Sequence, residues 1–149
     1  MIFAPADMMS EDVRDLLRLH IEEARQDECT AAFDEARLLE PDVDLFALRG
    51  EGGALLGIAA LKALSGGAAE VKSVRTHPDH LRRGVAHCLM DGIEAEARAR
   101  GLTTILLQTH PTDAYLAARR LYAARGYVRC GAFGDYPDDD HSVFMAFSL

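Results

Sequence analysis

Cysteine pairs, long apolar runs and surplus positive charge are all missing from this sequence. Three cysteines without CxxC spacing exclude a disulfide framework and are typical of a reducing compartment. No apolar run has the length of a membrane span, and the acidic N-terminus lacks the basic region of a signal peptide. We therefore expect a cytoplasmic protein that makes no use of a membrane.

The charge balance excludes one class of partner. A net charge of −8 argues against general nucleic-acid binding, because contacts with phosphates need a basic surface. The same charge suits a cationic substrate such as an amine, although acidic charge also serves solubility alone. With 149 residues and 49% hydrophobic residues, the chain has the size and composition of one globular domain, residues 1–149, that needs no disulfide or metal to fold.

Hydrophobic periodicity predicts an α/β protein. Helical spacing follows Ser10 and recurs over 30–39, 85–100 and 111–125. Apolar runs bounded by glycine and proline predict strands near 2–3, 43–50, 54–64, 70–76, 102–109, 127–133 and 142–149. The order is an antiparallel half followed by a βαβ crossover. We expect a mixed sheet of about six or seven strands flanked by about four helices.

The stretch LRRGVAHCLM, residues 81–90, places a glycine turn where a strand ends and a helix begins. The first N–H groups of a helix are unpaired and attract anions, and Gly84 lets a phosphate approach them. Arg82 and Arg83 add charges suited to phosphate oxygens. Neither GxxxxGK[ST] nor GxGxxG is present, so this is neither a P-loop nor a dinucleotide fingerprint. An ordinary turn with two solvated arginines is the alternative.

Two segments resemble the GNAT superfamily, the acetyl-CoA-dependent N-acetyltransferases. VKSVRTHPDHLRRGVAHCLM resembles its motif A, with His77-Pro78 followed by Gly84-Val85-Ala86. RRLYAARGYVRCG resembles its motif B, with Tyr122 before Gly126-Tyr127. The resemblance covers nearly the whole chain and looks closest to a small bacterial branch of mostly unassigned substrate. It implies the GNAT fold and transfer of an acetyl group from acetyl-CoA to a primary amine of a small molecule or peptide, by direct attack in a ternary complex.

The resemblance also implies where the coenzyme binds. Its pyrophosphate would lie on the backbone amides of the glycine turn, and its pantetheine arm on exposed backbone groups of Val74 and Thr76. A backbone amide there would polarise the thioester carbonyl, as an oxyanion donor does. The full implied set is Val74, Arg75, Thr76, Leu81, Arg82, Arg83, Gly84, Val85, Ala86, His87, Tyr115 and Ala118.

Two residues are the candidates for proton transfer. The resemblance places Tyr122 beside the coenzyme sulfur as general acid; the alternative is a core tyrosine that caps the sheet. An ammonium with a pKa near ~10 must lose a proton before it attacks. Glu70 is the candidate base, acting directly or through a water, because its offset from Leu81 matches the strand glutamate of the histone acetyltransferase branch. Its alternative is a strand-entry glutamate that is either exposed or paired with Lys72.

The remaining candidates concern the acceptor and a metal. Lys72, Gln108, Asp135 and Tyr136 are the substrate-site residues we predict. Lys72 and Arg75 are charges on an interior strand and need partners, such as Glu70 or the Asp135 region. The histidines that flank the turn come without HExxH or paired cysteines, so no metal is expected.

Three departures from the family pattern give weight to a second hypothesis, which ranks below the active enzyme because Tyr122 and Glu70 are intact. Leu81 stands where glutamine or arginine is usual, Gln108 where glutamate is frequent, and Tyr115 where asparagine is frequent. They support a non-catalytic acyl-CoA-binding module or sensor, with a plain interaction domain as the third reading. The apolar end, residues 142–149, permits a homodimer through the last strand. Nothing in the sequence names the acceptor amine.

Overall fold

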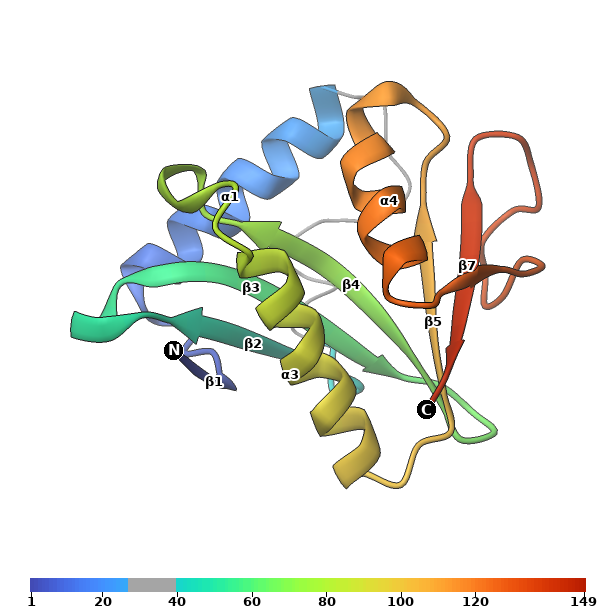
Figure 1. Cartoon of the computed structure of the whole chain (residues 1–149), viewed down its shortest axis with the longest axis horizontal. Helices are drawn as coiled ribbons and strands as arrows, with labels where there is room; N and C mark the ends of the chain where they lie inside the picture. Colours follow the sequence, from blue (N-terminus) through green and yellow to red (C-terminus); the bar gives the residue numbers. More distant parts are fainter. Residues whose placement is uncertain (27–39) are drawn as a thin grey trace.

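The computed structural model describes residues 1–26 and 40–149 (Figure 1). The described helices and strands are β1 (Ile2–Pro5), α1 (Glu11–Gln26), β2 (Val43–Arg49), β3 (Leu55–Ala63), β4 (Ala68–Thr76), α3 (Val85–Ala99), β5 (Thr104–Thr109), α4 (Leu116–Ala124), β6 (Val128–Arg129) and β7 (Val143–Ser148). The helix predicted over 30–39 lies outside the described residues. Within the described part, no helix is both long and apolar enough to cross a membrane.

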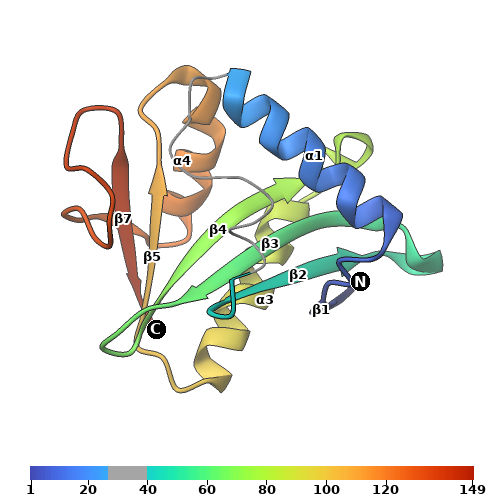
Figure 2. The ribbon, with the colours of Figure 1, turned by 180° about the vertical axis from the view of Figure 1, so that it is seen from behind.

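The seven described strands join one mixed sheet in the order β1-β2-β3-β4-β5-β7-β6. Every neighbouring pair is antiparallel except β4 and β5, which run parallel because α3 crosses over between them. The predicted α/β class and mixed sheet are confirmed. Helices α3 and α4 cover one face of the sheet and α1 covers the other, as the two opposite views show (Figures 1 and 2).

Each face of the sheet has its own hydrophobic core. On the α1 face, Val13, Leu16 and Leu17 pack against alternate residues of β2 and β3, such as Leu45 and Ile58. On the other face, α3 and α4 pack on the intervening strand residues, and this larger core consists of Phe46, Leu48, Ala59, Leu61, Ala69, Val71, Val85, Leu89, Met90, Ile93, Ala97, Ile105, Leu107, Tyr122, Tyr127, Val143 and Met145. Because side chains alternate along a strand, strands buried on both faces appear as continuous apolar runs in the sequence.

The sheet opens between its two central strands. β4 and β5 pair only over Ala68–Glu70 and Thr104–Leu106. Beyond Glu70 the strands separate, which is visible in both views (Figures 1 and 2). At the same place β4 bulges: its register with β3 shifts between Ile58 and Ala60, and Ser73 has a φ of 53°. A bulge bends a strand and increases its twist, so it directs β4 away from β5.

Two predicted boundaries were wrong. The strand expected over 127–133 is only Val128–Arg129, because the chain after Cys130 enters a loop that contains Gly131, Gly134 and Pro137. The helix expected from residue 111 begins as an α-helix at Leu116, after a 3₁₀ turn over Asp113–Tyr115. Tyr115 therefore does not share a regular helical face with Tyr122.

Candidate functional site

The glycine turn opens α3 as predicted. Gly84 has a φ of 76° and is the N-cap residue, a left-handed conformation that favours glycine. No side chain of the described residues caps the helix there, and its first internal bond runs from the Cys88 N–H to the Gly84 oxygen at 3.1 Å. The amides of residues 85–87 are thus available to an anion. Arg82 and Arg83 are exposed beside them.

A cleft of about 50 Å³ lies where β4 and β5 separate. The residues that line it are Glu70, Val71, Lys72, Ser73, Val74, Leu107, Gln108, Tyr122 and Tyr136. They come from β4, β5, α4 and the loop before β7. The structure therefore brings together the predicted acid, the predicted base and three of the four predicted substrate-site residues. Asp135 is exposed and does not line this cleft.

Tyr122 reaches the cleft from α4. The residue is 8% exposed, and its ring lies 5.8 Å from the ring of Tyr127, measured between centroids. Burial raises the pKa of the Tyr122 hydroxyl to about 12, because the phenolate would be desolvated. At neutral pH the hydroxyl is protonated, as a proton donor must be.

Glu70 is buried, in contrast to the exposed strand-entry glutamate considered as its alternative. The residue is 4% exposed, and burial raises the pKa of its carboxyl. The Tyr136 hydroxyl donates a hydrogen bond of 2.5 Å to Glu70 Oε2, and nearby Lys72 and Lys62 also oppose the shift. The Lys72 ammonium lies 5.9 Å from the centre of the Tyr136 ring. These contacts hold the carboxylate in one orientation at the cleft.

Two other predicted residues have structural partners. Gln108 donates a hydrogen bond of 3.0 Å from Nε2 to Ser142 Oγ, which joins β5 to the start of β7. Arg75 forms an ion pair with Glu23 of α1 rather than with Glu70 or Asp135. The partner predicted for Arg75 was therefore wrong, because the sequence does not reveal that α1 packs over this part of β4.

A network of charges that the sequence did not indicate joins the two helices of the site. Arg125, at the end of α4, pairs with Asp91 at 2.7 Å and with the buried Glu94, both on α3. Its guanidinium also donates to the backbone oxygen of His87 at 3.2 Å. The Tyr127 hydroxyl adds a long bond of 3.4 Å to Glu94. The helix that carries Tyr122 is thereby attached to the helix that begins at the glycine turn.

Ser73 is the cleft residue that sequence reasoning missed. It is 7% exposed, and its hydroxyl finds no hydrogen-bond partner among the described residues. A serine inside a strand pattern carries no signal of a bulge, so only the register of β3 with β4 reveals its conformation.

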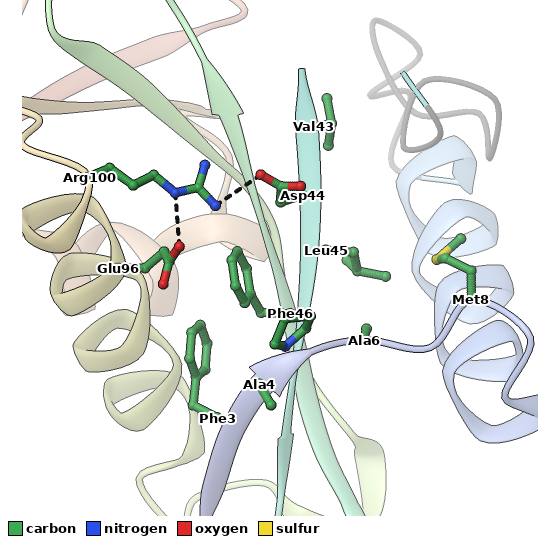
Figure 3. A pocket seen from close by; sticks show the side chains of 11 residues that line it. Phe3, Ala4, Ala6, Met8, Val43, Asp44, Leu45, Phe46, Glu96 and Arg100 are labelled. Atoms are coloured by element: carbon green, nitrogen blue, oxygen red, sulfur yellow. Dashed lines mark hydrogen bonds and ion pairs between the residues drawn. The ribbon is translucent and has the colours of Figure 1, made fainter. Parts of the chain in front are cut away.

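A second, larger pocket lies at the β1 edge of the sheet, beside β1 and β2 (Figure 3). Its volume is about 430 Å³, and it is lined mainly by apolar side chains such as Phe3 and Phe46. Arg100 is one of the lining residues, and its guanidinium pairs with both Asp44 and Glu96 at 2.9 Å (Figure 3). None of the predicted site residues lines this pocket.

The comparison with known proteins identifies the family. The profile of the Acetyltransferase (GNAT) family matches residues 10–127. The chain belongs to the GNAT acetyltransferase family. It is 36% identical over 146 residues to the uncharacterized N-acetyltransferase YedL of Escherichia coli, covering 96% of this chain and 91% of that protein.

Solved structures agree with this membership. A candidate acyl-CoA N-acyltransferase from Klebsiella pneumoniae superposes with a TM-score of 0.78 at 26% identity, covering 99% of this chain and 97% of that one. A Bacillus subtilis acetyltransferase in complex with CoA shares the fold, with a TM-score of 0.71, 17% identity, and coverage of 99% and 97%. The predicted family, fold and reaction class are confirmed: this GNAT protein is an acetyltransferase whose co-substrate is an acyl-CoA.

Within residues 1–26 and 40–149, no three histidine, cysteine, aspartate or glutamate side chains are placed to hold an ion together. The residues that are present fit an acyl-CoA instead, because uncapped amides and two arginines suit a pyrophosphate.

Proposed function

We propose that this GNAT enzyme transfers an acetyl group from acetyl-CoA to a primary amine, with Tyr122 as general acid and Glu70 as general base. One observation carries the assignment: both side chains line the cleft between β4 and β5, and β4 leads directly to the uncapped glycine turn. A thioester whose pyrophosphate lies on that turn would extend along β4 toward both residues.

The coenzyme would be held mostly by backbone groups. The N–H groups of residues 85–87 donate hydrogen bonds to the pyrophosphate oxygens, and Arg82 and Arg83 supply countercharge. Beyond Glu70, the side of β4 that faces β5 has no partner strand among those described. The backbone of Val74 and Thr76 is therefore available to pair with the pantetheine arm.

The proposed transfer accounts for every proton moved and every bond formed or broken. Glu70 takes a proton from the ammonium, directly or through a water, and the freed amine nitrogen attacks the thioester carbonyl carbon. The C–S bond breaks, and the sulfur takes the proton of the Tyr122 hydroxyl. The phenolate regains a proton from the acylated nitrogen, so that one proton in total is released to solvent.

The acceptor is proposed by its charge. A carboxylate at the cleft and a net charge of −8 favour a cationic amine over an anion. The proposed class of acceptor is therefore the primary amine of a small molecule or peptide. A cytoplasmic location is part of the proposal, because three cysteines without paired spacing suit a reducing compartment. A homodimer is proposed through the end of the sheet, where β6 covers only part of β7 and Val128 is 64% exposed.

Calorimetric titration with acetyl-CoA and with free CoA is the direct test. Micromolar binding of both, followed by thiol release with an amine from a panel, would support the proposal. Absence of binding at millimolar ligand would refute it. Binding without thiol release from any amine would instead favour the non-catalytic acyl-CoA-binding module.

A further inference from the structure

We propose that the Ser73 hydroxyl donates a hydrogen bond to the carbonyl oxygen of the bound thioester. The inference rests on the proposed function and adds a catalytic residue to it. It concerns a side chain, and is separate from the backbone amide that the family resemblance implies.

The first observation is an unused donor. Ser73 lines the cleft between Glu70 and Val74 on β4, and it is 7% exposed. Its hydroxyl has no partner among the described residues. Buried hydroxyls are almost always hydrogen-bonded, so an unpartnered one in a cleft indicates a ligand that supplies the missing acceptor.

The second observation is the backbone that carries this hydroxyl. Ser73 has a φ of 53°, which is unfavourable for a residue with a Cβ. The bulge places this conformation where β4 leaves β5 and nowhere else along β4. An unpaired polar group and an unfavourable dihedral at one residue both cost stability, and such costs concentrate at functional sites.

The carbonyl oxygen is the acceptor that fits. Glu70 already receives the Tyr136 hydroxyl, and in the proposed transfer Tyr122 gives its proton to the sulfur. When the amine nitrogen bonds to the carbonyl carbon, the C=O electron pair moves onto oxygen, which becomes negative. The electron pair re-forms the C=O bond when the C–S bond breaks. A hydroxyl already freed from water stabilises that charge without reorganising.

The deciding variant is Ser73→Gly. Glycine adopts a positive φ without strain, so the bulge and the Val74 amide are kept while the hydroxyl is lost. We expect kcat/KM to fall by about 10- to 100-fold, less than for a sole oxyanion donor because a backbone amide remains. Free CoA should bind unchanged, and the ratio of acetyl-CoA to CoA affinity should fall about 2- to 10-fold.

Two further variants separate the hydroxyl from the backbone. Ser73→Ala also lacks the hydroxyl but keeps a Cβ at positive φ. Its kcat/KM and its ratio of acetyl-CoA to CoA affinity should fall as much as those of Ser73→Gly. Ser65→Ala removes a hydroxyl from the exposed turn between β3 and β4 and should leave both affinities and turnover unchanged.

The outcomes distinguish this inference from the proposed function. If the wild type binds neither acetyl-CoA nor CoA, the proposed function and the role of Ser73 are both refuted. If the wild type binds both and Ser73→Gly keeps the affinity ratio and the turnover, only the role of Ser73 falls. If Ser73→Ala loses activity while Ser73→Gly keeps it, the bulge matters and the hydroxyl does not, which also overturns the inference.

Discussion

Two cavities within the described part of the chain differ in how their polar groups are satisfied. In the larger one, beside β1 and β2, Arg100 is paired with both Asp44 and Glu96, and the rest of the lining is mostly apolar. In the smaller one, between β4 and β5, Glu70 and Tyr122 have raised pKa values. Of two cavities, the larger is the usual first hypothesis for a ligand site, but perturbed titratable groups indicate the smaller one here.

The physical origin of the difference is the sheet. The pocket beside β1 forms because β1 is only four residues long and leaves part of β2 uncovered. The cleft between β4 and β5 forms because two parallel strands separate in the middle of the sheet, so that side chains from several elements meet there. Substitutions at both places test this contrast.

The largest effect should come from Gly84→Glu. A glutamate at the opening of α3 places a negative charge where the pyrophosphate would bind, so binding of acetyl-CoA and CoA should be abolished in calorimetry. Gly101→Glu is a matched control, because Gly101 also has a positive φ of 74° and open space around it, at the far end of α3. Both variants should lower the melting temperature similarly. Equal coenzyme binding by the two would refute the glycine turn as the anion site.

Tyr122→Phe should have the next largest effect. Removing the acid should lower kcat by about 100-fold or more, while acetyl-CoA affinity stays nearly intact. Tyr127→Phe is the control, because it removes a buried hydroxyl that bonds Glu94 outside the cleft. That control should keep its turnover within a few-fold. A Tyr122→Phe enzyme of full rate would exclude Tyr122 as the acid.

Glu70→Gln should lower kcat by about 10- to 100-fold and should stabilise the protein at pH 7. Burial raises the pKa of Glu70 in the folded state, so folding favours its protonated form. Its contribution to stability is therefore present below the unfolded pKa and is lost as pH rises through the folded pKa. Near neutral pH the ionised wild-type side chain opposes folding and glutamine does not.

Thermal melts at two pH values check this prediction. The melting temperature of Glu70→Gln should exceed that of the wild type at pH 7, and the difference should shrink below pH 4.5. The wild-type rate should also rise with pH through the raised pKa of Glu70. A variant that is less stable at pH 7 would mean that the hydrogen bond from Tyr136 outweighs desolvation.

The smallest effect should follow changes in the larger pocket. Arg100→Gln breaks two partly exposed ion pairs, so the free energy of unfolding should fall by only about 1 kcal/mol or less. Its kcat and KM should match those of the wild type. Denaturant titration and steady-state kinetics measure both. A tenfold change in KM would show that the larger pocket takes part in substrate binding.

Several features of the fold followed from local patterns. The 3.6-residue periodicity of α3, its glycine start at Gly84 and its glycine end at Gly101 depend on neighbours in the chain, and they were predicted correctly. The short β6 was not, because apolar residues alone do not tell a strand from a loop. The start of α4 was also wrong, because Pro111 and Thr112 open a 3₁₀ turn before the α-helix begins at Leu116.

The site divides in the same way. Sequence alone determined the glycine turn, with the family motifs around it, because motif A is contiguous in the chain and its backbone conformation is set by residues next to one another. Only the tertiary structure decided that Glu70 is buried, that Tyr136 bonds it, that Arg75 pairs with Glu23, and that Ser73 lies unpaired in a bulge. Those features depend on where two strands part and which helix covers them, and no local pattern encodes such long-range contacts.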